Sequence, residues 1–236
     1  MGLLVTDDAR VFLGRLTRLN PAAVVRVRPS GPGRTALWGQ VPWGALVTRE
    51  VDTGVDEDVT VAAAALLASA GELPERRDRL WRWPLPPDGG RVVEELPAGR
   101  VRELAAVAAG TLREVTRTGL RGRAVGARRL REALLDHVAI VVEPAAGTGA
   151  GTRPIDVPQR LVQATVRMGF LGDGGTGEGS NAGDGSGRRG GDERDGVPVR
   201  VRVTGGWVGL AAYYGTAWLP PAGPLGMRPV QPMRPG

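Results

Sequence analysis

Two segments in which valine alternates with arginine constrain the fold of this chain most strongly. Val24–Arg28 and Val199–Val203 both have a period of two, which places valines on one side of a β-strand and arginines on the other. Each segment follows a helical pattern and precedes a glycine turn and two apolar segments. We therefore expect an α+β fold with two antiparallel β-meander sheets and helices packed on them.

The first half of the chain predicts eight elements. Thr6 is typical of a helix N-cap, since Asp7 and Asp8 follow it, and Asn20-Pro21 ends the same pattern. Hydrophobic periodicity and turn residues bound the others. In order, we expect a helix at Asp7–Leu19, strands at Val24–Arg28, Thr35–Gln40 and Gly44–Glu50, a helix at Thr60–Ala70, strands at Leu80–Trp83 and Arg91–Glu95, and a helix from Pro97 to Arg117.

This order of elements, α-βββ-α-ββ-α, resembles the small sheet-and-helix fold of type III secretion chaperones and related binding proteins. The resemblance concerns only the order of elements in the N-terminal half, and it implies a fold rather than a function.

The second half predicts a comparable arrangement. We expect helices at Ala127–Asp136 and Pro158–Gly169, with a strand at His137–Glu143 between them. Residues 172–196 are mostly Gly, Asp, Ser and Arg, a composition typical of a disordered insert. The final strands are expected at Val199–Val203, Trp207–Ala212 and Thr216–Leu219. We place domains at residues 1–120 and 121–222, followed by a Pro-rich tail at 223–236.

The two helix-plus-meander units are open to two interpretations. They form either a divergent internal repeat, with Gly215 in the place of Gly44 and a pseudo-twofold relation between the sheets, or a chance likeness between tandem meanders. The sequence also leaves open whether the two halves form one domain or two, and which oligomeric state the chain adopts.

Missing residue types exclude most catalytic chemistry. The chain has no Cys and no Lys, which removes thiolate nucleophiles and ligands, the phosphate-binding lysine loop and Schiff-base chemistry. His137 is the single histidine, so a site with several histidine ligands is impossible. We expect no catalytic residues, no metal site and no cofactor. An enzyme that uses carboxylates distant in sequence is the one catalytic alternative.

The positive charge is concentrated in the middle of the chain. Residues 97–170 hold twelve Arg and six acidic residues, whereas the remaining residues are nearly neutral. Two interpretations fit this cluster: a surface for nucleic acid or another polyanion, or an exposed arginine-rich turn in a protein from a GC-rich genome. The residues concerned are Arg113, Arg117, Arg121, Arg123, Arg128, Arg129 and Arg131.

Trp81 and Trp83 are the residues we predict to contact a protein partner. They alternate along one predicted strand and precede Pro84-Leu85-Pro86-Pro87, so they could line a groove, although tryptophan in strands is usually part of the core. The leading functional hypothesis is a non-enzymatic protein-binding or adaptor module of unknown partner. Nucleic-acid binding through residues 113–131 is the alternative.

Four stretches resemble conserved uncharacterised proteins of actinobacteria. They are Ala36–Gly44, Arg82–Pro87, Leu134–Ile140 and Pro158–Phe170. The resemblance implies a bacterial cytoplasmic protein and transfers no site residues. The first residues lack a signal peptide pattern and no apolar run has the length of a membrane span, so we expect a cytoplasmic protein without membrane contact.

Overall fold

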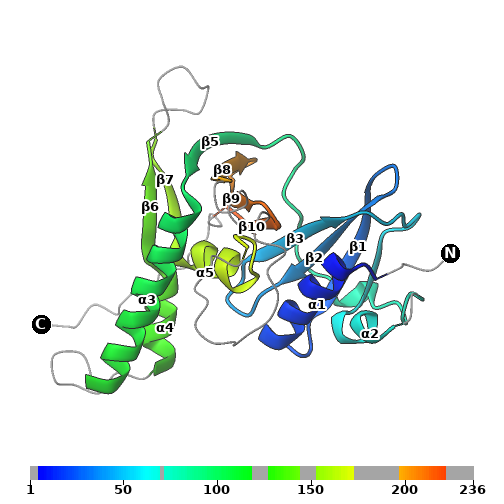
Figure 1. Ribbon diagram of the computed structural model, residues 1–236, viewed down its shortest axis with the longest axis horizontal. Helices are drawn as coiled ribbons and strands as arrows, with labels where there is room; N and C mark the ends of the chain where they lie inside the picture. Colours follow the sequence, from blue (N-terminus) through cyan, green and yellow to red (C-terminus); the bar gives the residue numbers. More distant parts are fainter. Residues whose placement is uncertain (1–4, 70–71, 119–126, 144–152, 173–196, 222–236) are drawn as a thin grey trace, which may run out of the picture.

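The computed structural model describes residues 5–69, 72–118, 127–143, 153–172 and 197–221. In these residues it shows an α+β fold with five α-helices, one eight-stranded antiparallel sheet and one two-stranded sheet (Figure 1). The predicted α+β class is confirmed. Apart from Gly172, the predicted insert at 172–196 lies outside the described residues, and so does the tail at 223–236.

The first helix and the first meander agree with the prediction. Helix α1 (Asp7–Leu19) begins after Thr6, whose hydroxyl accepts a hydrogen bond from the Ala9 amide at 3.2 Å. Its buried face includes Phe12, Leu13 and Leu16. Strands β1 (Val24–Gly31), β2 (Arg34–Gln40) and β3 (Leu46–Val51) follow as an antiparallel meander.

The predicted helix at Thr60–Ala70 is only partly correct. Val59–Ala62 form strand β4, which pairs with β1, and helix α2 (Ala63–Ala68) begins only after it. Thr60 was expected to cap this helix, but it lies buried in β4 opposite Arg26. Alternating Val59 and Val61 face the core, and β-branched residues favour a strand over a helix at this point.

Residues 81–90, here called the strap, lie across one face of the sheet without forming a strand. A short 3₁₀ helix, η1 (Asp78–Leu80), leads into the strap, which ends where β5 (Arg91–Leu96) begins. A strand was predicted at Leu80–Trp83, and it is absent from the described structure. Three prolines close behind it lack the amide hydrogens that a sheet requires.

The remaining elements lie near their predicted positions. The structure adds one short strand, at residues 155–158, that the sequence pattern did not predict. In chain order the elements are α3 (Ala98–Thr118), α4 (Ala127–Asp136), β6 (Val138–Val142), β7 (Ile155–Pro158), α5 (Gln159–Arg167), β8 (Val199–Thr204), β9 (Trp207–Ala212) and β10 (Gly215–Leu219).

The two predicted meanders join edge to edge into one continuous sheet. Strands β3 and β10 pair antiparallel through Leu46–Thr48 and Thr216–Trp218, a junction we call the seam. The strand order is β4-β1-β2-β3-β10-β9-β8-β5. Outward from the seam, the first half therefore has the order β3, β2, β1 and the second half the order β10, β9, β8. In both halves the last strand of the meander lies at the seam, which is the order that a twofold axis there would produce.

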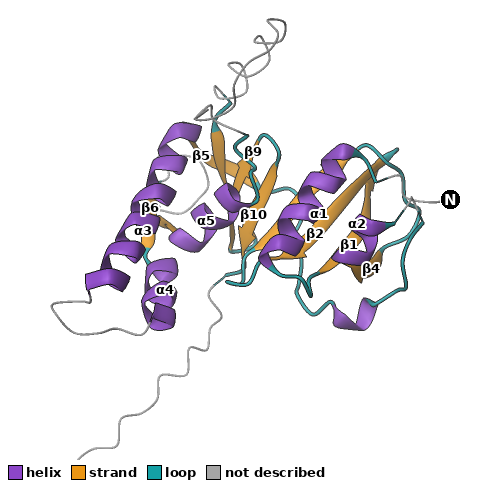
Figure 2. Ribbon diagram, turned by 60° about the horizontal axis from the view of Figure 1, so that its bottom comes forward, coloured by secondary structure: helices purple, strands orange, loops and turns teal. Residues whose placement is uncertain are grey.

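The two faces of the sheet carry different cores. Helices α1 and α5 pack on one face, α1 over β2 and β3 and α5 over β9 and β10 (Figure 2). Residues of both halves, among them Phe12, Leu37, Leu161 and Leu210, form one continuous core there. The opposite face carries a smaller cluster of Leu46, Trp207 and Trp218, covered in part by the strap.

Candidate functional site

The structure places Trp81 and Trp83 in the strap, packed onto the smaller core. Their rings meet edge to face with centroids 5.2 Å apart, and the Trp81 indole N–H donates to the Trp83 carbonyl at 2.7 Å. Both side chains are half-buried against the cluster of Leu46, Trp207 and Trp218. These contacts hold the strap on the sheet; contact with a partner stays a prediction.

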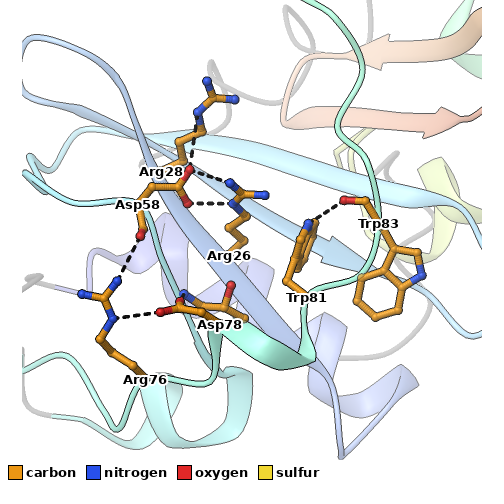
Figure 3. A network of polar contacts seen from close by, with 8 residues as sticks. Arg26, Arg28, Asp58, Arg76, Asp78, Trp81 and Trp83 are labelled. Carbon is orange, nitrogen blue, oxygen red and sulfur yellow. Dashed lines mark hydrogen bonds and ion pairs between the residues drawn. The ribbon is translucent and has the colours of Figure 1, made fainter.

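A polar network fixes the start of the strap to the edge of the sheet (Figure 3). Asp58 accepts two hydrogen bonds from the Arg26 guanidinium, both at 2.7 Å. Arg76 donates to Asp78 at 3.0 Å, and Asp78 accepts a hydrogen bond from the Thr60 amide at 2.7 Å. The network therefore joins β1 and β4 to the segment that leads into the strap.

These contacts shift the ionisation of the groups involved. The hydrogen bond from the Thr60 amide, followed by the one from Arg76, lowers the pKa of Asp78 below its ordinary value of 3.8. The hydrogen bond to Asp58 raises the pKa of Arg26. The Arg26 guanidinium also lies 5.9 Å from the centre of the Trp81 ring, within the range of a cation–π contact. The ionic network and the tryptophan pair thus support one another.

The arginine cluster of residues 113–131 is divided between two helices. Arg113 and Arg117 lie on α3, whereas Arg128, Arg129 and Arg131 lie on α4. Arg121 and Arg123 lie outside the described residues. Two members form ion pairs on their own helices, Arg117 with Glu114 at 2.9 Å and Arg128 with Glu132 at 3.0 Å.

Three of these arginines line a groove with a volume of about 840 Å³. The groove lies between the end of α1, the loop after β2 and helices α3, α4 and α5. Figure 2 shows these last three helices at one end of the molecule. Its apolar lining consists of Leu19, Pro42, Trp43, Ala108, Ala109, Leu112, Leu134 and Leu135.

Five exposed arginines surround this apolar lining, and we call them the arginine rim. They are Arg18, Arg113, Arg128, Arg131 and Arg167. The single acidic residue of the groove, Glu132, is bound to Arg128. Arg18, Arg113, Arg131 and Arg167 form no ion pair with any described residue, so the groove has a strong positive charge. Sequence reasoning missed Arg18 and Arg167, because their helices lie far from residues 113–131 in the chain.

Partly buried polar contacts hold the base of the groove in place. The Gln159 and Gln163 side-chain amides of α5 donate to the backbone carbonyls of Leu104 and Ala105 on α3, at 3.3 and 3.2 Å. The Trp43 indole N–H donates to the Arg160 carbonyl at 2.9 Å, and Arg160 donates back to the Trp43 carbonyl at 3.1 Å. Helix α5 thus connects α3 to the loop after β2.

Among the described residues, neither His137 nor any carboxylate other than Glu132 lines this groove. His137 is exposed at the junction of α4 and β6, where its backbone carbonyl accepts a hydrogen bond from the Gln159 backbone N–H at 2.8 Å. No three His, Cys, Asp or Glu side chains of the described residues come together in a way that could hold a metal ion. The groove offers apolar contact and guanidinium groups, which are the groups that complement apolar side chains and carboxylates.

No described helix has the length and apolar content needed to cross a bilayer.

No curated protein and no solved structure matches the chain. Two family models do match: the domain of unknown function DUF8010 over residues 5–83, and the domain of unknown function DUF8185 over residues 85–224. The two matched regions meet at Pro84, within the strap. Since the second model covers more than half of the 236 residues, the chain belongs to the family described as domain of unknown function DUF8185.

Proposed function

We propose that this protein is a non-enzymatic protein-binding module that holds an acidic, amphipathic segment of a partner in the arginine-rimmed groove. The observation that carries the proposal is the combination of a half-buried apolar lining with five arginines and one already paired acidic residue. A segment with Leu, Ile, Phe or Val on one side and Asp or Glu on its flanks would satisfy both parts.

The dimensions and the chemistry of the groove support a peptide segment. A volume of about 840 Å³ accommodates several side chains, and neighbouring helices commonly offer such grooves to an amphipathic partner helix. Guanidinium groups bind carboxylates in a bidentate geometry, and arginine is enriched among residues that dominate binding energy. Gln159 and Gln163 hold the base of the groove by hydrogen bonds before any partner binds, which lowers the cost of ordering that part of the site.

A random-peptide display library, selected on the immobilised full-length protein, tests this proposal. We expect enriched peptides to combine acidic residues with large apolar ones. The double variant Arg113→Glu and Arg131→Glu should weaken their binding by about tenfold or more, which corresponds to about 1.4 kcal/mol. Arg129→Glu is the matched control, because Arg129 lies on the same helix as Arg131 and is absent from the groove lining. Enrichment of peptides without acidic residues would contradict the proposal.

Nucleic-acid binding is the second candidate, and the net positive charge of the groove favours it. It predicts binding of a single-stranded or double-stranded oligonucleotide that weakens steeply with salt and is lost in the same double variant. The apolar lining argues for a peptide instead, since a phosphate backbone gains nothing from half-buried leucines. Fluorescence anisotropy with labelled oligonucleotides, at low and at physiological salt, distinguishes the two candidates.

We infer an actinobacterial source and a cytoplasmic location for this module. The four stretches that resemble uncharacterised actinobacterial proteins support the source, and the absence of Cys is in keeping with a reducing compartment. Cell fractionation of a native host with an antibody against the protein would test the location.

A further inference from the structure

A second concavity, of about 800 Å³, lies at the seam where the two meanders join, and we call it the seam cleft. Sheet residues Trp38, Thr48, Thr216 and Trp218 are part of its lining, together with Pro86–Gly90 of the strap and the tyrosines 213 and 214 between β9 and β10. A site of this size at the junction of two structural units is typical of small-molecule binding. It shares no lining residue with the arginine-rimmed groove.

Two buried polar atoms without a hydrogen-bond partner belong to this cleft. Among the described residues, the buried side-chain nitrogen and oxygen atoms that lack a partner are Thr48 Oγ1 and Arg202 Nε, and both residues line the seam cleft. A buried polar atom that makes no hydrogen bond is destabilising and calls for an explanation. Thr48 and Arg202 are only partly buried as whole residues, so a small rotation of either side chain would bring its unpartnered atom to a molecule bound in the cleft.

The charges of the cleft leave one guanidinium without a carboxylate. Arg34 is paired with Glu50 at 2.7 Å, and the nearly buried Arg49 is paired with Asp8 at 2.5 Å. Arg202 donates to the Gly90 carbonyl at 2.7 Å and forms no ion pair with any described residue. Asp88, the strap carboxylate in the lining, is exposed to solvent, where its charge is screened. Arg202 is therefore the group that an anion would pair with.

We propose that the seam cleft binds a small molecule that combines an oxyanion, either carboxylate or phosphate, with a planar ring. The oxyanion pairs with Arg202, and the ring lies against the aromatic side chains, which include Trp38 and Tyr213. Thr48 and Arg202 lie on strands separated by β10 and β9, and in the register Thr48 aligns with Arg200, two residues before Arg202. Their Cα atoms are therefore about 16 Å apart at the usual strand spacing and rise per residue. A ligand that reaches both has the size of a nucleoside monophosphate.

Isothermal titration calorimetry on the full-length protein tests this proposal with four probes: AMP, 4-hydroxybenzoate, adenosine and inorganic phosphate. We expect saturable binding of AMP, of 4-hydroxybenzoate or of both, tighter than that of adenosine or phosphate, since only the first two combine ring and oxyanion. Binding of AMP alone assigns a phosphate ligand, and binding of 4-hydroxybenzoate alone assigns a carboxylate ligand. Absence of saturable binding by either ring-bearing anion would overturn the proposal.

Variants in the cleft identify the groups responsible. Arg202→Gln and Thr48→Val should each weaken binding by about tenfold or more, whereas Thr48→Ser, which keeps the hydroxyl, should retain it. Arg200→Gln is the matched control: Arg200 lies on the same strand, pairs with Glu95 and is absent from the cleft lining. Thermal melting of each variant checks its fold. Binding that survives Arg202→Gln in a folded variant would overturn the proposal, as would equal losses in Arg200→Gln.

Discussion

At the scale of single residues, the packing between β9 and β10 depends on the absence of one side chain. Gly209 lies opposite Trp218 in the register, and a Cβ atom at Gly209 would approach the Trp218 ring to 2.5 Å. The indole ring thus occupies the space above the glycine and helps to form the smaller core with Leu46 and Trp207. A glycine within a strand often marks such a close approach.

Substitution of glycine by alanine should therefore have opposite effects at two positions. Gly209→Ala should lower the free energy of unfolding by about 1–3 kcal/mol, because the indole has to move from its packed position. Gly14→Ala should raise it by about 0.5–1 kcal/mol, because Gly14 lies within α1 and nothing lies within 4 Å of its added Cβ. Urea unfolding of both variants measures the difference. Equal effects at the two positions would contradict the packing seen at Trp218.

At the scale of elements, the strap depends on Asp78, and this dependence predicts a pH effect. A carboxyl whose pKa is lower in the folded protein stabilises the fold above its unfolded value of 3.8, and this contribution disappears as the pH falls through the folded value. Asp78→Asn should therefore be less stable than the wild type at neutral pH, and the difference should vanish in acid, well below pH 3.8.

Urea unfolding at a series of pH values measures this difference. Asp88→Asn is the matched control, since Asp88 is an exposed carboxylate of the strap that accepts no hydrogen bond from any described residue. Its effect should stay within about 0.5 kcal/mol at all pH values. A constant difference between wild type and Asp78→Asn down to acid pH would show that the carboxylate does not stabilise the strap.

Elements with local signals could be predicted from the sequence, and those that depend on distant contacts could not. Helix α1 was predicted with its observed bounds, because Thr6 and Pro21 mark its two ends locally. Strand β4 was missed, because its four residues before an Ala-rich helix become a strand only through pairing with β1. The groove shows the same limit: Arg113 and Arg131 belong to a visible charge cluster, whereas Arg18 reaches it only through tertiary packing.

At the scale of the whole molecule, the seam turns two similar units into one body. The pairing of β3 with β10 extends the hydrogen-bonded sheet across both matched family regions. Helix α5, from the second region, also contacts the loop after β2, where Arg160 and Trp43 exchange two hydrogen bonds. The strap adds a third connection, because it runs across the face of the sheet from η1, which contacts β4 of one half, to β5 of the other.

These three connections predict that both halves unfold together. The larger core contains buried residues of both regions, such as Phe12 of α1 and Phe170 after α5, whose rings stack at 6.4 Å. Exposure of one half would open that core and leave the edges of β3 or β10 unpaired, which disfavours a half-folded state. Equilibrium unfolding in urea should give one transition, with the same midpoint by tryptophan fluorescence and by far-UV circular dichroism. Hydrogen exchange should give equal opening free energies for the amides of β2 and β9. Two separate midpoints, or a lower opening free energy for one of these strands, would show that the two regions are independent folding units that only share an edge.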